Sequence, residues 1–239
     1  MKNAGSRALM IMAKAPFPGE AKTRLAANLG PDAAAHLHRA FLLDTLARVQ
    51  TLAIDLVGVV CPDHRHRRAL VDILPPRVEV LAQTRPGLMA GITEAVGAGL
   101  SSGTGTVVVI EADSPNLPGP YIEAAFQAAE QLTRGIVLGP CDDGGYYLVA
   151  ARGIEPRHAR DLFEGERYES HTICERTAGR ARTLGLEVAI TSPWYDVDTL
   201  HDLHRLHAQL GEDPASLPHV REALNRVQLP PPAADCVAG

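Results

Sequence analysis

The stretch TVVVI at residues 106–110 is followed directly by EADSP at residues 111–115. This junction is the strongest indication of the fold in the sequence. All five residues of the first segment are β-branched and uncharged, which is typical of a central parallel strand buried on both faces. Ligands of open α/β sheets bind beyond the carboxyl ends of such strands. Residues i and i+2 of an extended segment share a face, so Glu111 and Asp113 could together hold a divalent cation. The alternative is a plain strand-to-helix turn, because Asp and Pro both favour turns.

On both sides of this strand, short apolar runs alternate with helical patterns. The pattern predicts further strands at residues 9–13, 54–60, 78–81, 136–138, 146–150 and 187–191. It predicts helices at residues 31–50, 64–74, 88–100, 121–133, 171–184 and 200–210. Such alternation indicates an α/β fold with three layers, in which helices cover both faces of a mostly parallel sheet. We expect one domain over residues 1–228 and a disordered tail over residues 229–239, which are rich in Pro and Ala.

Composition narrows the classes of partner. The chain has 239 residues and a formal net charge of −5, and only 4% of its residues are aromatic. A basic nucleic-acid footprint and a stacking platform for single strands are therefore not expected. No apolar run approaches the roughly 20 residues of a membrane-spanning helix. The four cysteines are widely spaced, which favours reduced thiols and a cytoplasmic location.

A basic loop follows the first predicted strand. It reads KAPFPGEAKTR at residues 14–24, and its last residues open a helix. Free N–H groups at a helix start favour phosphate, and the side chains of Lys22 and Arg24 add positive charge there. The loop is not a Walker A motif, because Pro16 and Ala21 stand where that motif requires glycine. Phosphate binding is the favoured interpretation, and an ordinary surface loop is the alternative.

Two further segments contain acidic residues with open interpretations. The run DDGGYY at residues 142–147 is typical of an Asp-Gly hairpin turn, but paired glycines also let a backbone approach a ligand closely. In DVDTLHD at residues 196–202, Thr199 and Asp202 have the spacing of a helix capping box. That leaves Asp198 without a structural explanation. Histidines at positions 64, 66, 201, 204 and 207 are expected to be ordinary helix residues.

Taken together, these segments resemble a known family. KAPFPGEAKTRL, the strand ending in ADSP, GPCDDGGYYLVA and DVDTLHDL occur in this order between about residues 9 and 206. They are similar to a bacterial family of glycosyltransferase-A-like (GT-A) proteins, some of which carry the name arsenosugar-biosynthesis glycosyltransferase. The family is also similar to 2-phospho-L-lactate guanylyltransferase and to the wider nucleotide-diphospho-sugar transferases.

The resemblance implies a single GT-A domain, a Rossmann-like three-layer fold, and roles for particular residues. It implies a nucleotide and phosphate site at Lys14, Pro16, Gly19, Lys22, Thr23 and Arg24. It implies that Asp113 and Asp198 hold Mg²⁺ or Mn²⁺, with Glu111 as an extra carboxylate where the family usually has Gly. Asp143, Gly144, Gly145 and Tyr146 would line the donor or acceptor side. We expect Asp113 and Asp143 to be catalytic residues. No general base is assigned from the sequence, and Asp142 and Asp143 are candidates for it on proximity alone.

Two segments depart from the family pattern. Residues 86–92 read PGLMAGI where the family has GDLGxRM, and residues 163–170 read FEGERYES where it has FxGxxWST. The phosphate and metal residues are kept, while the segments expected near the base or acceptor are changed. Substrate identity therefore does not follow from the resemblance.

Three functions are consistent with these features. The leading expectation is a metal-dependent glycosyltransferase that moves a sugar from a nucleotide-diphospho-sugar to a small-molecule acceptor. The first alternative is a nucleotidyltransferase that joins an NTP to a phosphorylated small molecule and releases pyrophosphate. The second alternative is a silent nucleotide-binding protein, since a fold does not fix a function.

Overall fold

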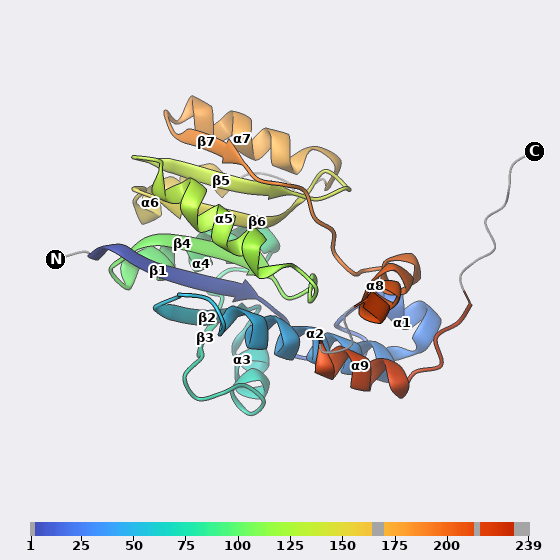
Figure 1. Ribbon diagram of the computed structural model, residues 1–239. Helices are drawn as coiled ribbons and strands as arrows, with labels where there is room; N and C mark the ends of the chain where they lie inside the picture. The colour runs from blue at the N-terminus through green and yellow to red at the C-terminus, as the bar shows by residue number, and fades with distance from the viewer. Residues whose placement is uncertain (1–2, 164–169, 213–215, 232–239) are drawn as a thin grey trace, which may run out of the picture.

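The computed structural model of the chain describes residues 3–163, 170–212 and 216–231. A seven-stranded sheet forms its centre (Figure 1), with the strand order β3-β2-β1-β4-β6-β5-β7. The strands are β1 (Asn3–Met12), β2 (Leu56–Cys61), β3 (Glu79–Ala82), β4 (Thr104–Glu111), β5 (Gly135–Pro140), β6 (Tyr146–Arg152) and β7 (Glu187–Ile190). Only β6 runs antiparallel to its neighbours among these strands, so the prediction of a mostly parallel sheet is confirmed.

Helices surround the sheet. They are α1 (Thr23–Leu29), α2 (Pro31–Val49), α3 (His64–Val71), α4 (Leu88–Ser101), α5 (Gly119–Glu130), α6 (Pro156–Phe163), α7 (Ile173–Thr183), α8 (Leu200–Glu212) and α9 (Pro218–Asn225), with a short 3₁₀ turn, η1 (Ser170–Thr172). One face of the sheet packs on α4, α6 and α7, and the other packs on α3, α5 and the second half of α2. The α/β prediction with helices on both faces is therefore confirmed.

The strand predicted at residues 106–110 is confirmed as β4, buried in the middle of the sheet. Val107, Val108, Val109 and Ile110 are each at most 2% exposed. β4 pairs in parallel with β1, with Met12 opposite Glu111. Because the two strands end at the same level, the residues that follow them are brought to one edge of the sheet.

A third apolar cluster lies beyond that edge. It joins α1 and the first half of α2 to α8 and α9 through residues such as Leu37, Phe41 and Leu206. In Figure 1 these helices lie together past the tip of β1. Since α2 contributes to this cluster and also to the cluster on the sheet, it fixes the C-terminal helices relative to the carboxyl ends of the strands.

Most predicted elements match, and the differences lie at ends and in short helices. The first strand begins at Asn3 rather than at residue 9, and the helix predicted at 171–184 begins as a 3₁₀ turn. The helices α6 and α9 were not predicted. The domain limits stay a prediction, as does the tail, of which residues 229–231 are described and have no regular structure. Within the described ranges, none of the helices combines the length and the apolar character of a membrane span.

Candidate active site

The loop between β1 and α1 is anchored to α3. Ala15 N donates to His66 Nδ1 over 2.9 Å, and Arg65 stacks over the Phe17 ring with its guanidinium carbon 3.8 Å from the ring centre. Arg65 also pairs with Glu20 at 2.8 Å. Gly19 turns the chain with φ +81°, a conformation that favours glycine. These contacts hold the basic loop at the edge of the sheet where β1 ends.

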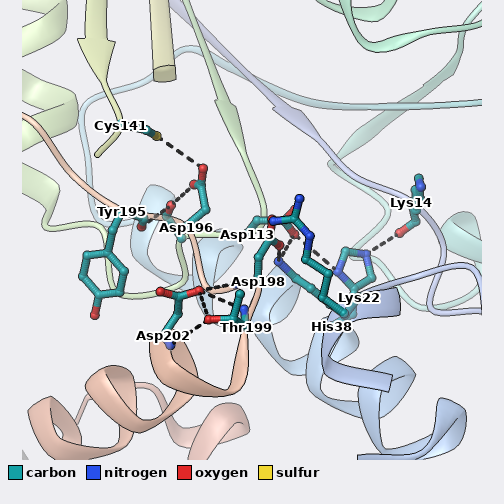
Figure 2. Close-up of polar contacts among 12 residues, drawn as sticks. Lys14, Lys22, His38, Asp113, Cys141, Tyr195, Asp196, Asp198, Thr199 and Asp202 are labelled. Carbon is teal, nitrogen blue, oxygen red and sulfur yellow. Dashed lines mark hydrogen bonds and ion pairs between the residues drawn. The ribbon is translucent and has the colours of Figure 1, made fainter. Parts of the chain in front are cut away.

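Lys22 ends this loop and points inward. It caps α1 with φ 50°, an unusual conformation for a residue other than glycine, and its side chain is 1% exposed. The ammonium nitrogen lies 2.9 Å from Asp113 Oδ1 and 2.9 Å from Asp198 Oδ1 (Figure 2). Burial opposes the charged form, but the two carboxylates outweigh it and raise the pKa of Lys22. Lys22 thus bridges the two aspartates that the sequence predicted as metal ligands.

The two aspartates come from segments far apart in the chain, and the backbone joins those segments. Val197 N donates to the backbone oxygen of Asp113 over 2.9 Å, and Ala112 N donates to Met12 O over 3.1 Å. The segment after β4 is therefore tied both to β1 and to the segment before α8. The side chains of Asp113 and Asp198 are brought to one place by main-chain contacts.

The capping box predicted at Thr199 and Asp202 is confirmed, and it orients Asp198. Asp202 Oδ2 accepts from Thr199 N over 2.8 Å and from Thr199 Oγ1 over 2.7 Å. The same oxygen accepts from Asp198 N over 3.2 Å. Since α8 begins at Leu200, its first turn holds the backbone of Asp198 while the carboxylate is left to Lys22 (Figure 2).

Acidic groups outnumber buried cations at this edge of the sheet. Burial, together with the nearby charges of Asp196 and Asp113, raises the pKa of Glu111 well above its usual value. Burial likewise raises the pKa of Asp196, which accepts from Ser114 Oγ over 2.6 Å. For Asp113 burial acts in the same direction, but the Lys22 ammonium outweighs it and lowers the pKa. An additional positive charge would therefore be favourable here.

His38 completes the cluster, and the sequence analysis missed it. It lies on α2, is 4% exposed, and places Nε2 3.0 Å from Lys14 O. Its Nδ1 is 3.6 Å from Asp113 Oδ1. Burial lowers the pKa of His38, although Asp113 opposes this effect. The helical pattern of α2 offered no signal, since the partners of His38 come from residues 14 and 113.

These residues face a cavity of about 590 Å³. The basic and acidic residues that line it are Lys14, Glu20, Lys22, Arg24, His38, Glu111, Asp113 and Asp198. A second part of the wall is less polar and consists of residues such as Val60, Pro62, Gln83, Gly87 and Leu88. Gly87 and Leu88 belong to the segment 86–92 that departs from the family pattern. The cavity therefore combines a charged region with a less polar wall, to which segment 86–92 contributes.

The basic residues of the predicted phosphate site divide into two kinds. Lys22 is buried and engaged with carboxylates, whereas Lys14 and Arg24 are exposed at the cavity. Arg24 is 74% exposed, and its nearest carboxylate oxygen, Asp198 Oδ2, is 3.9 Å away. Thr23 lines the cavity as well, but Pro16 and Gly19 do not. Lys14 and Arg24 are thus the cations with side chains open to a ligand.

The hairpin at residues 141–145 has a structural explanation. It joins the antiparallel strands β5 and β6, and Asp143 Oδ1 accepts from Gly145 N over 2.9 Å within the turn. Gly144 has φ +86°, and a Cβ there would lie 2.5 Å from His171 O. Tyr146 is buried, with its hydroxyl 3.8 Å from the Met89 sulfur. None of residues 143–146 lines the large cavity, so their predicted ligand roles stay predictions.

The donor set fits a divalent cation, although the carboxylates are bridged by a lysine. Among the described residues, no three carboxylate, imidazole or thiol groups converge as a ready metal cage. The Lys22 ammonium lies between Asp113 and Asp198, and so a cation is already accommodated at that point. Mg²⁺ is commonly bound by only one or two carboxylates together with substrate phosphates. Asp113 and Asp198 could therefore hold such an ion when a phosphate ligand supplies further oxygens.

Known proteins resemble the chain over most of its length, and two of them are at least 28% identical to it. It is 31% identical over 217 residues to a phosphoenolpyruvate guanylyltransferase of Rhodococcus erythropolis (strain PR4 / NBRC 100887), covering 82% of this chain and 88% of the relative. A crystal structure from Desulfovibrio desulfuricans G20, described as a candidate nucleotide-diphospho-sugar transferase, is 28% identical with a TM-score of 0.80. That match covers 92% of this chain and 96% of the other.

A more distant structure shares the fold. Rv0371c from Mycobacterium tuberculosis H37Rv, solved in complex with manganese, is 15% identical with a TM-score of 0.53, over 85% of this chain and 98% of its own. Fold and relatives together define the class: the chain is a transferase of the group that includes nucleotidyltransferases and nucleotide-diphospho-sugar transferases. More particularly, it belongs to the family described as "Uncharacterized protein conserved in bacteria (DUF2064)", whose profile matches residues 43–170.

The predicted site falls partly outside the family match. Asp113 and the hairpin lie within residues 43–170, whereas the basic loop, His38 and Asp198 lie outside. The family resemblance at residues 163–170 also involves residues 164–169, which lie outside the described part of the chain. The assignment of site residues therefore rests on the geometry of the cavity.

Proposed function

We propose that the chain transfers a nucleotidyl group from an NTP to a phosphorylated small molecule and releases pyrophosphate. The main support for this proposal is the set of charged residues that line the cavity. Lys14 and Arg24 are open to a polyphosphate, and Asp113 and Asp198 stand beside them. The predicted base for an acceptor hydroxyl, Asp143, is exposed and occupied within its own turn. A phosphorylated acceptor needs no such base, because its attacking oxygen is already an anion.

In this reaction an oxygen of the acceptor phosphate attacks the α-phosphorus. The bond from the α-phosphorus to the bridging oxygen breaks, and pyrophosphate leaves with the electron pair. Lys14 and Arg24 bind the β- and γ-phosphates and stabilise the charge that develops on the leaving group. Before a metal ion binds, Lys22 keeps Asp113 and Asp198 close together through its two ion pairs. Their carboxylates would hold Mg²⁺ or Mn²⁺, which supplies charge neutralisation to the phosphates when bound.

Glycosyl transfer from a nucleotide-diphospho-sugar remains the second candidate. The structural relative with a TM-score of 0.80 is described as a candidate for that activity. Glu111 lines the same cavity, and burial raises its pKa, so it is the described carboxyl best suited to exchange a proton there. The two reactions differ in product, since glycosyl transfer releases a nucleoside diphosphate. We expect either reaction to occur in the cytoplasm, as the cysteine spacing indicates.

The test combines binding with product detection. Purified protein is incubated with each NTP, or with each common nucleotide-sugar, in Mn²⁺, Mg²⁺ or EDTA, together with a panel of phosphorylated carboxylic acids that includes phosphoenolpyruvate. We expect one NTP, with GTP the first to try, to raise the melting temperature in the presence of metal and to yield pyrophosphate with one acceptor. Release of a nucleoside diphosphate from a nucleotide-sugar would instead establish glycosyl transfer.

Asp113→Asn should abolish the metal-dependent shift and lower turnover at least about 100-fold, because it removes a carboxylate that would hold the metal ion and thereby the positive charge that the ion supplies to the phosphates. Asp32→Asn is the matched control, since Asp32 is exposed in the first turn of α2 and does not line the cavity. Binding without turnover across the whole panel would favour a silent nucleotide-binding protein. Full activity of Asp113→Asn would refute the proposed site.

A further inference from the structure

The geometry of His38 leaves one ring nitrogen without a function in the fold. Its Nε2 lies 3.0 Å from Lys14 O. A carbonyl oxygen only accepts hydrogen bonds, so Nε2 carries the proton in the neutral ring, and Nδ1 presents a lone pair. That nitrogen is buried and has no hydrogen-bond partner among the residues that the structure describes. A buried polar atom without a partner is costly and calls for an explanation.

The Asp113 carboxylate does not provide that partner. Asp113 Oδ1 is 3.6 Å from Nδ1, and both atoms are acceptors when the imidazole is neutral. Figure 2 shows the ring lying between the Lys14 carbonyl and Asp113. Asp113 Oδ1 already contacts the Lys22 ammonium at 2.9 Å, so the atom left without a partner is His38 Nδ1. A hydrogen-bond donor or a metal ion placed between the two acceptors would satisfy it.

His66 provides an internal comparison. It is 5% exposed, compared with 4% for His38, and it contacts the next residue of the same loop. Its Nδ1 accepts from Ala15 N over 2.9 Å, and its Nε2 faces Glu20 Oε2 at 3.5 Å. Both nitrogens of His66 therefore have a neighbour of suitable chemistry. Burial of an imidazole in this protein does not by itself leave a nitrogen unpaired.

The separation of the two acceptors is close to that of two ligands on one ion. Ligand atoms about 2.1 Å from a metal lie about 3.0 Å apart at a right angle and about 3.4 Å apart at a tetrahedral angle. The observed 3.6 Å therefore needs only a small inward movement. Asp113 Oδ1 is also the oxygen that Lys22 contacts at 2.9 Å, so an ion bound there competes with the lysine ammonium.

We propose that His38 Nδ1 is a nitrogen ligand of the divalent cation and, with Asp113, makes this site selective for transition metals over Mg²⁺. The inference rests on the proposed function, which places the cation at Asp113 and Asp198. Imidazole nitrogen raises the affinity of a site for ions such as Mn²⁺ and Co²⁺ much more than for Mg²⁺, which prefers oxygen. His38 thereby determines which metal the enzyme uses.

The experiment measures metal binding directly. Mn²⁺ affinity is obtained by electron paramagnetic resonance and Co²⁺ coordination from its visible absorption, with and without GTP, and Mg²⁺ affinity by competition. The variants are His38→Gln, His66→Gln and Asp113→Asn. The glutamine amide can still donate to Lys14 O, so His38→Gln keeps the contact to the loop but loses the ring nitrogen. His66→Gln controls for loss of a buried imidazole beside the same loop.

We expect His38→Gln to weaken Mn²⁺ and Co²⁺ binding at least about 10-fold and to change the Co²⁺ spectrum, with little effect on Mg²⁺. His66→Gln should retain the wild-type spectrum and metal preference. His38→Gln could instead keep the wild-type spectrum and metal preference while Asp113→Asn loses metal binding. In that case the metal site is supported, but the inference about His38 is wrong, and water satisfies the unpaired nitrogen. If the wild type binds no divalent cation even with GTP, the metal part of the proposed function fails together with the inference.

Discussion

Lys22 holds two carboxylates in place from a backbone conformation that few lysines adopt. Its φ of 50° directs the side chain inward from the start of α1, where the ammonium bridges Asp113 and Asp198. Asp198 is 43% exposed and Asp113 is 29% exposed, so water screens the carboxylates better than it screens the ammonium. The lysine therefore serves as the internal counterion of the site.

Lys22→Met should destabilise the protein in EDTA by about 3 kcal/mol, the lower end of the range for breaking a buried ion pair, because the carboxylates are partly exposed. Mn²⁺ should restore part of that loss, since the vacated position suits a cation. The measurement is urea denaturation of wild type and variant in EDTA and in Mn²⁺. Lys14→Met is the control, because Lys14 belongs to the same loop but is exposed. Equal stability of the two variants would contradict the bridging role.

Part of this residue-level picture could be predicted from the sequence. Asp113 drew attention because it follows a buried strand, and Asp198 because it lacks a capping role. Only the family resemblance paired the two as metal ligands. The bridge by Lys22 and the presence of His38 could not be predicted, because both depend on contacts between residues 14–38 and residues 113–198. Spacing along the chain carries no information on such pairs.

At the scale of elements, β1 is tied to α5 at the end opposite the site. Arg7 on β1 contacts Glu130 on α5 through Nε at 2.7 Å and through its second terminal nitrogen at 3.0 Å. It also pairs with Glu123 at 2.9 Å. The hydrogen bond from Arg7 lowers the pKa of Glu130 below its usual value of 4.5. The ion pairs of Arg7 with Glu130 and Glu123 therefore hold β1 against α5, the helix that covers it.

The ion pair has a defined pH dependence. Because the pKa of Glu130 is lower in the folded state, its contribution to stability is present above about pH 4.5 and is lost as the pH falls through the folded value. Glu130→Gln should therefore reduce the free energy of unfolding by about 1 kcal/mol at pH 7, and this difference should shrink below pH 4.5. Urea denaturation at both pH values measures it. If the loss of unfolding free energy in Glu130→Gln did not change with pH, the ion pair would not be its source. Glu222→Gln is the control, because Glu222 on α9 forms an exposed ion pair with Arg226.

The elements that were predicted and those that were missed differ in burial and length. β4 was evident because four consecutive residues, 107–110, are apolar and buried on both faces of the sheet. The helices α6 and α9 span eight residues each and bury only a few apolar side chains, among them Leu162 and Phe163 in α6 and Val220 and Leu224 in α9. So few positions do not establish a helical period. Their stability comes from packing on α4 and α2, which lie far away in the sequence.

Across the whole molecule, the site joins three segments separated by more than eighty residues at each step. The loop after β1, the residues after β4 and the residues before α8 meet at one edge of the sheet. The C-terminal helices pack on α1 and α2, and this third cluster places Asp198 opposite Asp113. The fold class follows from the alternation of strands and helices, but this meeting of segments follows only from the folded chain.

Ligand binding should therefore protect backbone amides in all three segments together, although these segments lie far apart in the sequence. With metal and the NTP that binds, amide hydrogen exchange should slow together in residues 13–24, 111–114 and 194–199, while the helices α6 and α7 stay unchanged. The reason is that a ligand in the cavity contacts all three segments, whereas neither helix lines it. Protection confined to a single segment would show that the cavity is not the shared binding site.

The hydrogen bond between Val197 N and the backbone oxygen of Asp113 has a consequence for how such proteins diverge. It draws the two acidic segments together without using any side chain, so it survives every substitution at positions 111, 113 and 198 that keeps the backbone path. Architecture and chemistry are thus inherited separately. After gene duplication, one copy could change the side chains at these positions and acquire a new metal preference or substrate. The backbone arrangement that positions those side chains would be the same in both copies.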